Sequence, residues 1–78
     1  MRKKTRRLIV AFFSTHDAMA FEDYCGSHGA EGRLIPLPKE ISAGCGLAWS
    51  APPDDEEGLK ALLRSSGIKA QHVRELEV

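Results

Sequence analysis

The sequence has no excess of charge of either sign and no long apolar stretch. Its 78 residues include 11 basic and 11 acidic side chains, and its longest apolar run, Leu8 to Phe13, has six residues. Charge neutrality argues against a nucleic-acid partner. Six apolar residues are too few for a membrane span or for the ~7–15 residues of a signal-peptide core. We therefore expect no nucleic-acid partner and no membrane partner.

Cysteine is also scarce, since the chain has only Cys25 and Cys45. Two cysteines do not build a disulfide framework, and without an export signal a reducing cytoplasm is the expected location. Three scattered histidines do not form a zinc motif, so no metal is expected. A glycine-rich phosphate loop, a catalytic triad and a paired-carboxylate site are also missing, so no cofactor is expected and an enzyme is the least favoured class.

A chain of this length has room for one domain, which buries around 60% of its unfolded surface. We interpret residues 8–78 as that domain and residues 1–7 as a basic N-terminal tip. We expect the tip to be a solvated, frayed terminus, with contact to RNA or a membrane as the weaker alternative. Its cations are Arg2, Lys3, Lys4, Arg6 and Arg7.

Hydrophobic patterning in the first half predicts a strand, a helix and a second strand. The apolar run from Leu8 to Phe13 suits a central strand buried on both faces. A helix capped by Ser14 or Thr15 follows, and Gly29 is expected to end it. Its buried face is predicted to hold Ala18, Phe21 and Cys25. The second strand is expected over residues 32–37, where two prolines favour a sheet edge or a strand exit.

The second half repeats this order. Leu47 to Ala51 predicts a third strand, in which Trp49 is expected to be a packing residue. Four acids at residues 54–57 then suit the first turn of a helix, whose buried stripe is Leu59, Leu62 and Leu63 and whose end is Gly67. The last strand, residues 70–78, has weak periodicity, which favours a bulge or an edge position.

The two halves correspond when shifted by 38 positions, so that Phe21 falls on Leu59 and Cys25 on Leu63. Two βαβ-like units with short, right-handed connections predict the ferredoxin-like βαββαβ fold. The expected class is therefore α+β, with two helices on one face of a four-stranded antiparallel sheet. In this topology the turn at residues 14–17 and the loop at residues 36–46 share one end of the sheet.

That loop holds Cys45 between Gly44 and Gly46, which permit unusual backbone angles and remove bulk beside the sulfur. A thiol with a pKa of ~8.5 becomes a better nucleophile beside cations or helix N-termini, and the first-turn amides, His16 and Lys39 are candidates for that role. The alternative is that Cys45 is only a small residue in a tight turn, and the residues favour neither reading. Cys25 is interpreted as a core residue because it aligns with Leu63.

An ordered set of residues carries a family resemblance. Ser14-Thr15-His16 after an apolar strand, the run from Gly32 to Ser42 (GRLIPLPKEIS), and Cys45-Gly46-Leu47-Ala48 resemble the Se/S carrier protein-like family of small bacterial proteins, over roughly residues 8–78. The resemblance implies that Cys45 holds sulfur or selenium as a persulfide or selenopersulfide. It also implies a cysteine desulfurase-like donor protein and an acceptor protein.

The loop, the helix start and the resemblance together indicate which residues support this site. These residues are Ser14, Thr15, His16, Arg33, Lys39, Ser42, Gly44 and Gly46. The resemblance says nothing about residues 1–7. The Cys-Pro-x-Pro helix start of the better-known sulfur-relay proteins is missing, so analogy with their mechanism is loose. A second hypothesis is a ferredoxin-like regulatory or protein-interaction module without thiol chemistry. Homodimerisation through a strand edge is left open.

Overall fold

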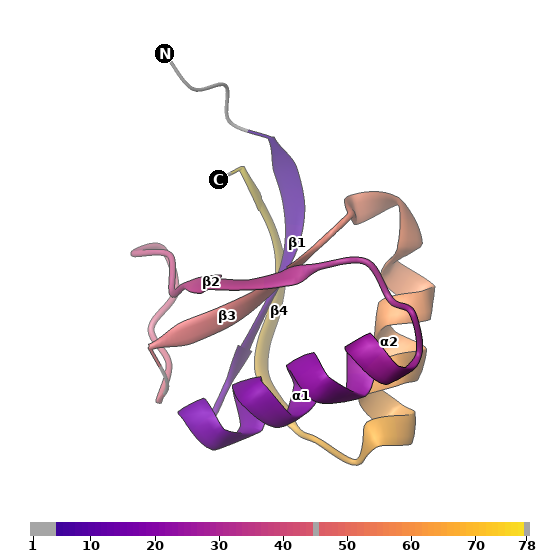
Figure 1. The fold of residues 1–78 in the computed structure, drawn as a ribbon. Coiled ribbons are helices and arrows are strands. Elements are labelled where there is room, and N and C mark those ends of the chain that lie inside the picture. The colour runs from indigo at the N-terminus through magenta and orange to yellow at the C-terminus, as the bar shows by residue number, and fades with distance from the viewer. Residues whose placement is uncertain (1–4, 45, 78) are drawn as a thin grey trace.

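The structure is a computed structural model that describes residues 5–44 and 46–77. Its four strands form one antiparallel sheet in the order β2-β3-β1-β4, and both helices pack on one face of it (Figure 1). This arrangement confirms the predicted ferredoxin-like α+β fold. The elements in chain order are β1 (Arg6–Phe12), α1 (Thr15–Ser27), β2 (Arg33–Pro36), β3 (Leu47–Ala51), a 3-10 turn (Pro53–Asp55), α2 (Glu56–Ser66) and β4 (Ala70–Glu77).

The main hydrophobic core lies between the sheet and the two helices. Its centre is an aromatic cluster in which the Phe21 ring centroid lies 5.4 Å from that of Phe12 and 5.8 Å from that of Trp49. Aromatic pairs at such spacings add to the stability gained from burial alone. Trp49 is therefore a packing residue, as predicted. The other buried members are Leu8, Val10, Ala18, Cys25, Ala51 and Leu59.

The helix ends follow local rules that the sequence had indicated. Ser14 caps α1 by accepting a hydrogen bond from the amide of Asp17 at 3.1 Å. Gly29, with φ of 67°, follows the helix end, and the amide of Ala30 donates to the Cys25 carbonyl at 2.9 Å. This pattern closes a helix C-terminus because it satisfies its free carbonyls. In α2 the caps are Asp55, which accepts from the Gly58 amide, and Gly67.

Strand β1 begins at Arg6, two residues earlier than predicted. Because β4 extends to Glu77, Arg6 and Arg7 have strand partners in Glu77 and Leu76. The Arg6 side chain also forms an ion pair with Glu75 at 2.9 Å. Arg6 and Arg7 are thus part of the sheet, so the prediction that they belong to a frayed terminus is wrong for these two residues.

Strand β4 is a sheet edge and carries a bulge, as its weak periodicity had suggested. His72 pairs with Ala11, whereas Ala70 pairs with Phe12, so Gln71 is the extra residue between two neighbouring pairs. A bulge breaks the alternation of side chains between the two faces of a strand. It therefore allows Gln71 and His72 to reach the same region of the molecule.

The helix-free face of the sheet carries a second, smaller core. Ile9, Ala11 and Ala48 are buried there beneath Ile41, which comes from the loop between β2 and β3 and is only 4% exposed. The helices were predicted to cover one face, which is confirmed, but the covering of the opposite face by this loop was not anticipated. Within the described residues, no helix is both long and apolar enough to cross a membrane.

Candidate functional site

The loop between β2 and β3 ends against Phe13, the residue that follows β1. A Cβ atom built on Gly44 would collide with the carbonyl oxygen of Phe13, the residue just before the α1 cap, Ser14. The loop and the start of α1 therefore meet at one end of the sheet, as the topology predicted (Figure 1). The reason for glycine at position 44 differs from the expectation, because Gly44 is not among the glycines with positive φ. Close approach of two backbones requires it.

Three side chains of β4 hold the backbone of this loop. Gln71 Oε1 accepts from the Gly44 amide at 3.0 Å, and Arg74 Nη1 donates to the Glu40 carbonyl at 3.2 Å. His72 Nε2 lies 2.9 Å from the Ser42 carbonyl, and since a carbonyl only accepts, the ring nitrogen donates. Sequence reasoning missed all three residues. The only available signal was the irregular pattern of the last strand, which indicated a bulge but not its purpose.

Backbone hydrogen bonds close the loop on itself. The amide of Leu37 donates to the Gly46 carbonyl at 3.0 Å, and the amide of Ile41 donates to the Pro38 carbonyl at 3.0 Å. Cys45 itself lies outside the described residues. Both of its neighbours are hydrogen-bonded, Gly44 through its amide to β4 and Gly46 through its carbonyl to Leu37, just after β2. The chain on either side of the thiol is thus fixed by the fold.

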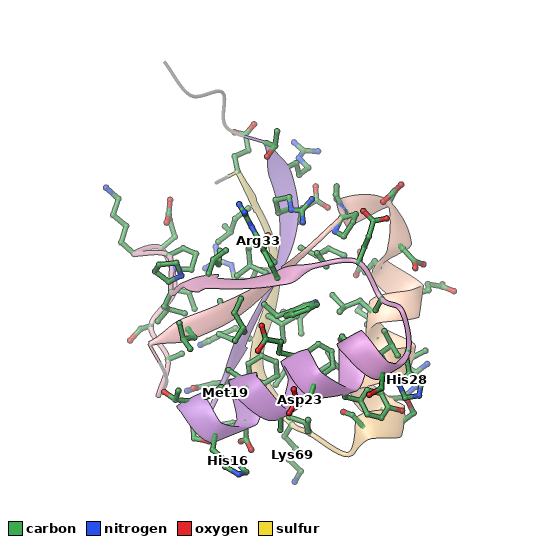
Figure 2. The ribbon with its side chains drawn as sticks, in the orientation of Figure 1. His16, Met19, Asp23, His28, Arg33 and Lys69 are labelled. Atoms are coloured by element: carbon green, nitrogen blue, oxygen red, sulfur yellow. The ribbon has the colours of Figure 1, made fainter. Side chains whose placement is uncertain are left out.

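The remaining predicted site residues are spread over the molecule. Thr15 and His16 are exposed in the first turn of α1, and His16 points away from the sheet (Figure 2). Lys39 is exposed in the turn at the far bend of the loop. Within residues 5–44 and 46–77, neither His16 nor Lys39 forms a side-chain hydrogen bond or an ion pair.

Arg33 is separated from this end of the sheet. It lies at the first position of β2 opposite Ser50, whereas the loop leaves β2 after Pro36, which pairs with Leu47. The structure therefore brings Ser42, Gly44 and the α1 cap to one end of the sheet, and leaves Arg33 at the other end of its strand.

The second cysteine, Cys25, is fully buried in the main core. Desolvation by burial raises its pKa from 9.0 to about 11. Its burial confirms the prediction that Cys25 is a core residue. A thiol with such a pKa is also almost entirely protonated near neutral pH. Among the described residues, no cluster of three or more His, Cys, Asp or Glu side chains could hold a metal ion.

Comparison with known proteins gives one match. Residues 7–75, which are most of the chain, match the family described as "Putative Se/S carrier protein-like". No curated protein and no solved structure matches the chain. The match covers β1 through most of β4 and includes the loop held by Gln71 and His72. The chain therefore belongs to the Se/S carrier protein-like family.

Proposed function

We propose that this protein carries sulfur or selenium on Cys45, as a persulfide or selenopersulfide, and passes it to a partner protein. One observation carries the assignment of the thiol. Of the two cysteines, Cys25 is fully buried and its pKa is raised to about 11, so it is neither accessible nor ionised at neutral pH. Membership of the carrier family supports the nature of the cargo.

The proposed reaction is a transfer of one sulfur atom between two cysteines. The Cys45 thiolate attacks the outer sulfur of a persulfide on the donor protein. A new S–S bond forms at Cys45 while the donor's S–S bond breaks, and the donor cysteine leaves as a thiolate. The proton of the persulfide either stays on the transferred sulfur or passes to solvent. No net oxidation occurs, and the same exchange with an acceptor thiol unloads the carrier.

The fixed loop supports this role because a carrier must present its thiol in a defined position to two partners. In the proposal, Gly44, Gly46 and Ser42 shape the loop, and Ser14 and Thr15 begin the helix beside it. His16 points away from the sheet and Lys39 lies at the far bend of the loop, so neither is given a part in the thiol chemistry. Arg33 lies at the other end of β2 and is given no part in the thiol chemistry.

The donor in this proposal is a cysteine desulfurase-like protein, and the acceptor is a second protein, both in a reducing cytoplasm. The test is to incubate the protein with a cysteine desulfurase and either cysteine or selenocysteine, and to measure its intact mass. Wild type and Cys25→Ala should each gain one sulfur or selenium atom, and Cys45→Ser should gain none. If Cys45→Ser gains the same mass as wild type, Cys45 is not the acceptor. If wild type gains no mass, the module without thiol chemistry is favoured.

A further inference from the structure

Three arginines share the helix-free face of the sheet. The strand register places Arg33 opposite Ser50, Ser50 opposite Ile9, and Ile9 opposite Arg74, in one row across all four strands. Arg7 precedes Ile9 by two residues on β1, so its side chain points to the same face. Because Ile9 is buried under the loop between β2 and β3, this face is the helix-free face of the sheet.

Arg7 contacts Ser50 through its side chain, and Arg33 is its neighbour in the sheet. The Arg7 guanidinium lies over Ser50, with Nε donating to its hydroxyl at 3.0 Å and Nη2 donating to its carbonyl at 3.3 Å. Arg33 is the direct strand neighbour of Ser50 on β2 and is exposed, and its side chain is directed away from α1 (Figure 2). Ser50 itself is 3% exposed and is the buried polar residue of the described chain. The geometry places one guanidinium on the buried hydroxyl and a second arginine at the neighbouring strand position.

None of these cations is neutralised by a carboxylate within the described residues. The ion pairs found there are Arg6 with Glu75 and Lys60 with Glu56. Arg74 donates to a backbone carbonyl in the loop, which carries no charge. Arg7 and Arg74 stand diagonally on the neighbouring strands β1 and β4, where like charges repel one another. A bound anion would remove this repulsion and would use guanidinium N–H groups that Ser50 leaves free.

We propose that Arg7 and Arg33, with Ser50 between them, bind a small oxyanion of the phosphate type, with Arg74 adding a third positive charge. Guanidinium groups donate planar pairs of hydrogen bonds that match phosphate oxygens. The described residues that the four strands place on this face include no Phe, Tyr or Trp, so the strands themselves lack the stacking platform of single-stranded nucleic-acid binders. This inference is independent of the proposed role of Cys45.

The experiment is a phosphate titration of the 15N-labelled protein at constant ionic strength, following the Arg Nε–H resonances by NMR. We expect saturable shifts at Arg7 and Arg33, and at least tenfold weaker binding in Arg33→Gln. Arg7→Lys keeps the positive charge but loses the planar pair of N–H donors, and it should also bind phosphate at least tenfold more weakly. Arg64→Gln removes the same charge from the exposed end of α2 and should leave the affinity unchanged. Backbone spectra establish that each variant is folded.

Two outcomes would overturn the proposal. The first is the lack of saturable shifts at Arg7 and Arg33, or an equal loss in Arg64→Gln, which would mean unspecific charge attraction. The second is binding of a short RNA at least a hundredfold tighter than phosphate and equally sensitive to Arg33→Gln, which would assign the face to nucleic acid. Cys45→Ser should bind phosphate as wild type does, so a failure of the carrier function would not affect this result.

Discussion

Gln71 Oε1 accepts a hydrogen bond from the Gly44 amide at 3.0 Å, although the two residues lie 27 positions apart. The contact joins the bulge of β4 to the residue immediately before Cys45. Because the bulge directs Gln71 and His72 to the same loop, the edge strand and the proposed carrier loop form one unit. The irregularity in β4 thus has a function in holding this loop.

Removing the Gln71 side chain should loosen the loop without unfolding the protein. We expect Gln71→Ala to lose about 1 kcal/mol of stability, the typical net value of one hydrogen bond. The Gly44 amide should exchange with deuterium several-fold faster, because it loses its acceptor. Gln71→Glu keeps an acceptor oxygen and should restore slow exchange. Unchanged exchange in Gln71→Ala would show that this bond does not hold the loop.

The two glycines beside Cys45 should differ sharply in their tolerance of a methyl group. Gly44→Ala should destabilise the protein by about 1–3 kcal/mol, because its Cβ meets the Phe13 carbonyl and one of the two backbones must move. Gly46→Ala is the matched control, since a Cβ there meets no atom of the described residues within 4 Å. Urea denaturation measures both. Equal effects would contradict the close approach of Gly44 to Phe13.

Ile41 should anchor the loop to the helix-free face of the sheet. We expect Ile41→Ala to cost about 2–4 kcal/mol, since it removes a buried side chain and leaves a cavity over Ile9 and Ala48. Ile41→Val should cost about 1 kcal/mol, because only one methyl group is lost. Thermal denaturation gives both values. A loss below about 0.5 kcal/mol in Ile41→Ala would mean that the loop does not depend on this contact.

Burial of Cys25 should make stability depend on pH at the alkaline end. The folded-state pKa of about 11 lies above the unfolded value of 9.0, so this stabilisation is fully present below pH 9 and is lost as the pH rises towards 11. Because Tyr and Lys also titrate there, wild type is compared with Cys25→Ala. The difference in their unfolding free energies should shrink by about 2 kcal/mol between pH 8 and pH 10.5. A constant difference would contradict the burial argument.

The two thiols should also differ in reactivity. In the folded protein at pH 7.5, iodoacetamide should modify Cys45 alone, because alkylation requires an accessible thiolate and Cys25 offers neither access nor charge. Peptide mapping identifies the modified residue, and full modification of both cysteines in urea is the control. If Cys25 reacted as fast as Cys45 in the native protein, burial would not distinguish the two thiols.

Local features of the fold were predictable because they depend on neighbouring residues. The α1 cap at Ser14, the helix end at Gly29 and the buried face formed by Phe21 and Cys25 follow from side-chain chemistry and helical periodicity. The similarity of the two halves then predicted the ferredoxin-like βαββαβ fold and the meeting of the loop with the start of α1. The choice of Cys45 over Cys25 also came from this comparison, because Cys25 aligns with a core leucine.

The tertiary structure alone decided what holds the loop and which charges gather. Gln71, His72 and Arg74 reach the loop across 27 to 34 positions, and Arg7 reaches Ser50 across 43. Periodicity reports which face of its own element a residue occupies, but not which distant backbone group its polar end meets. Such contacts depend on strand register and on one bulge, and these are set only when all four strands pair.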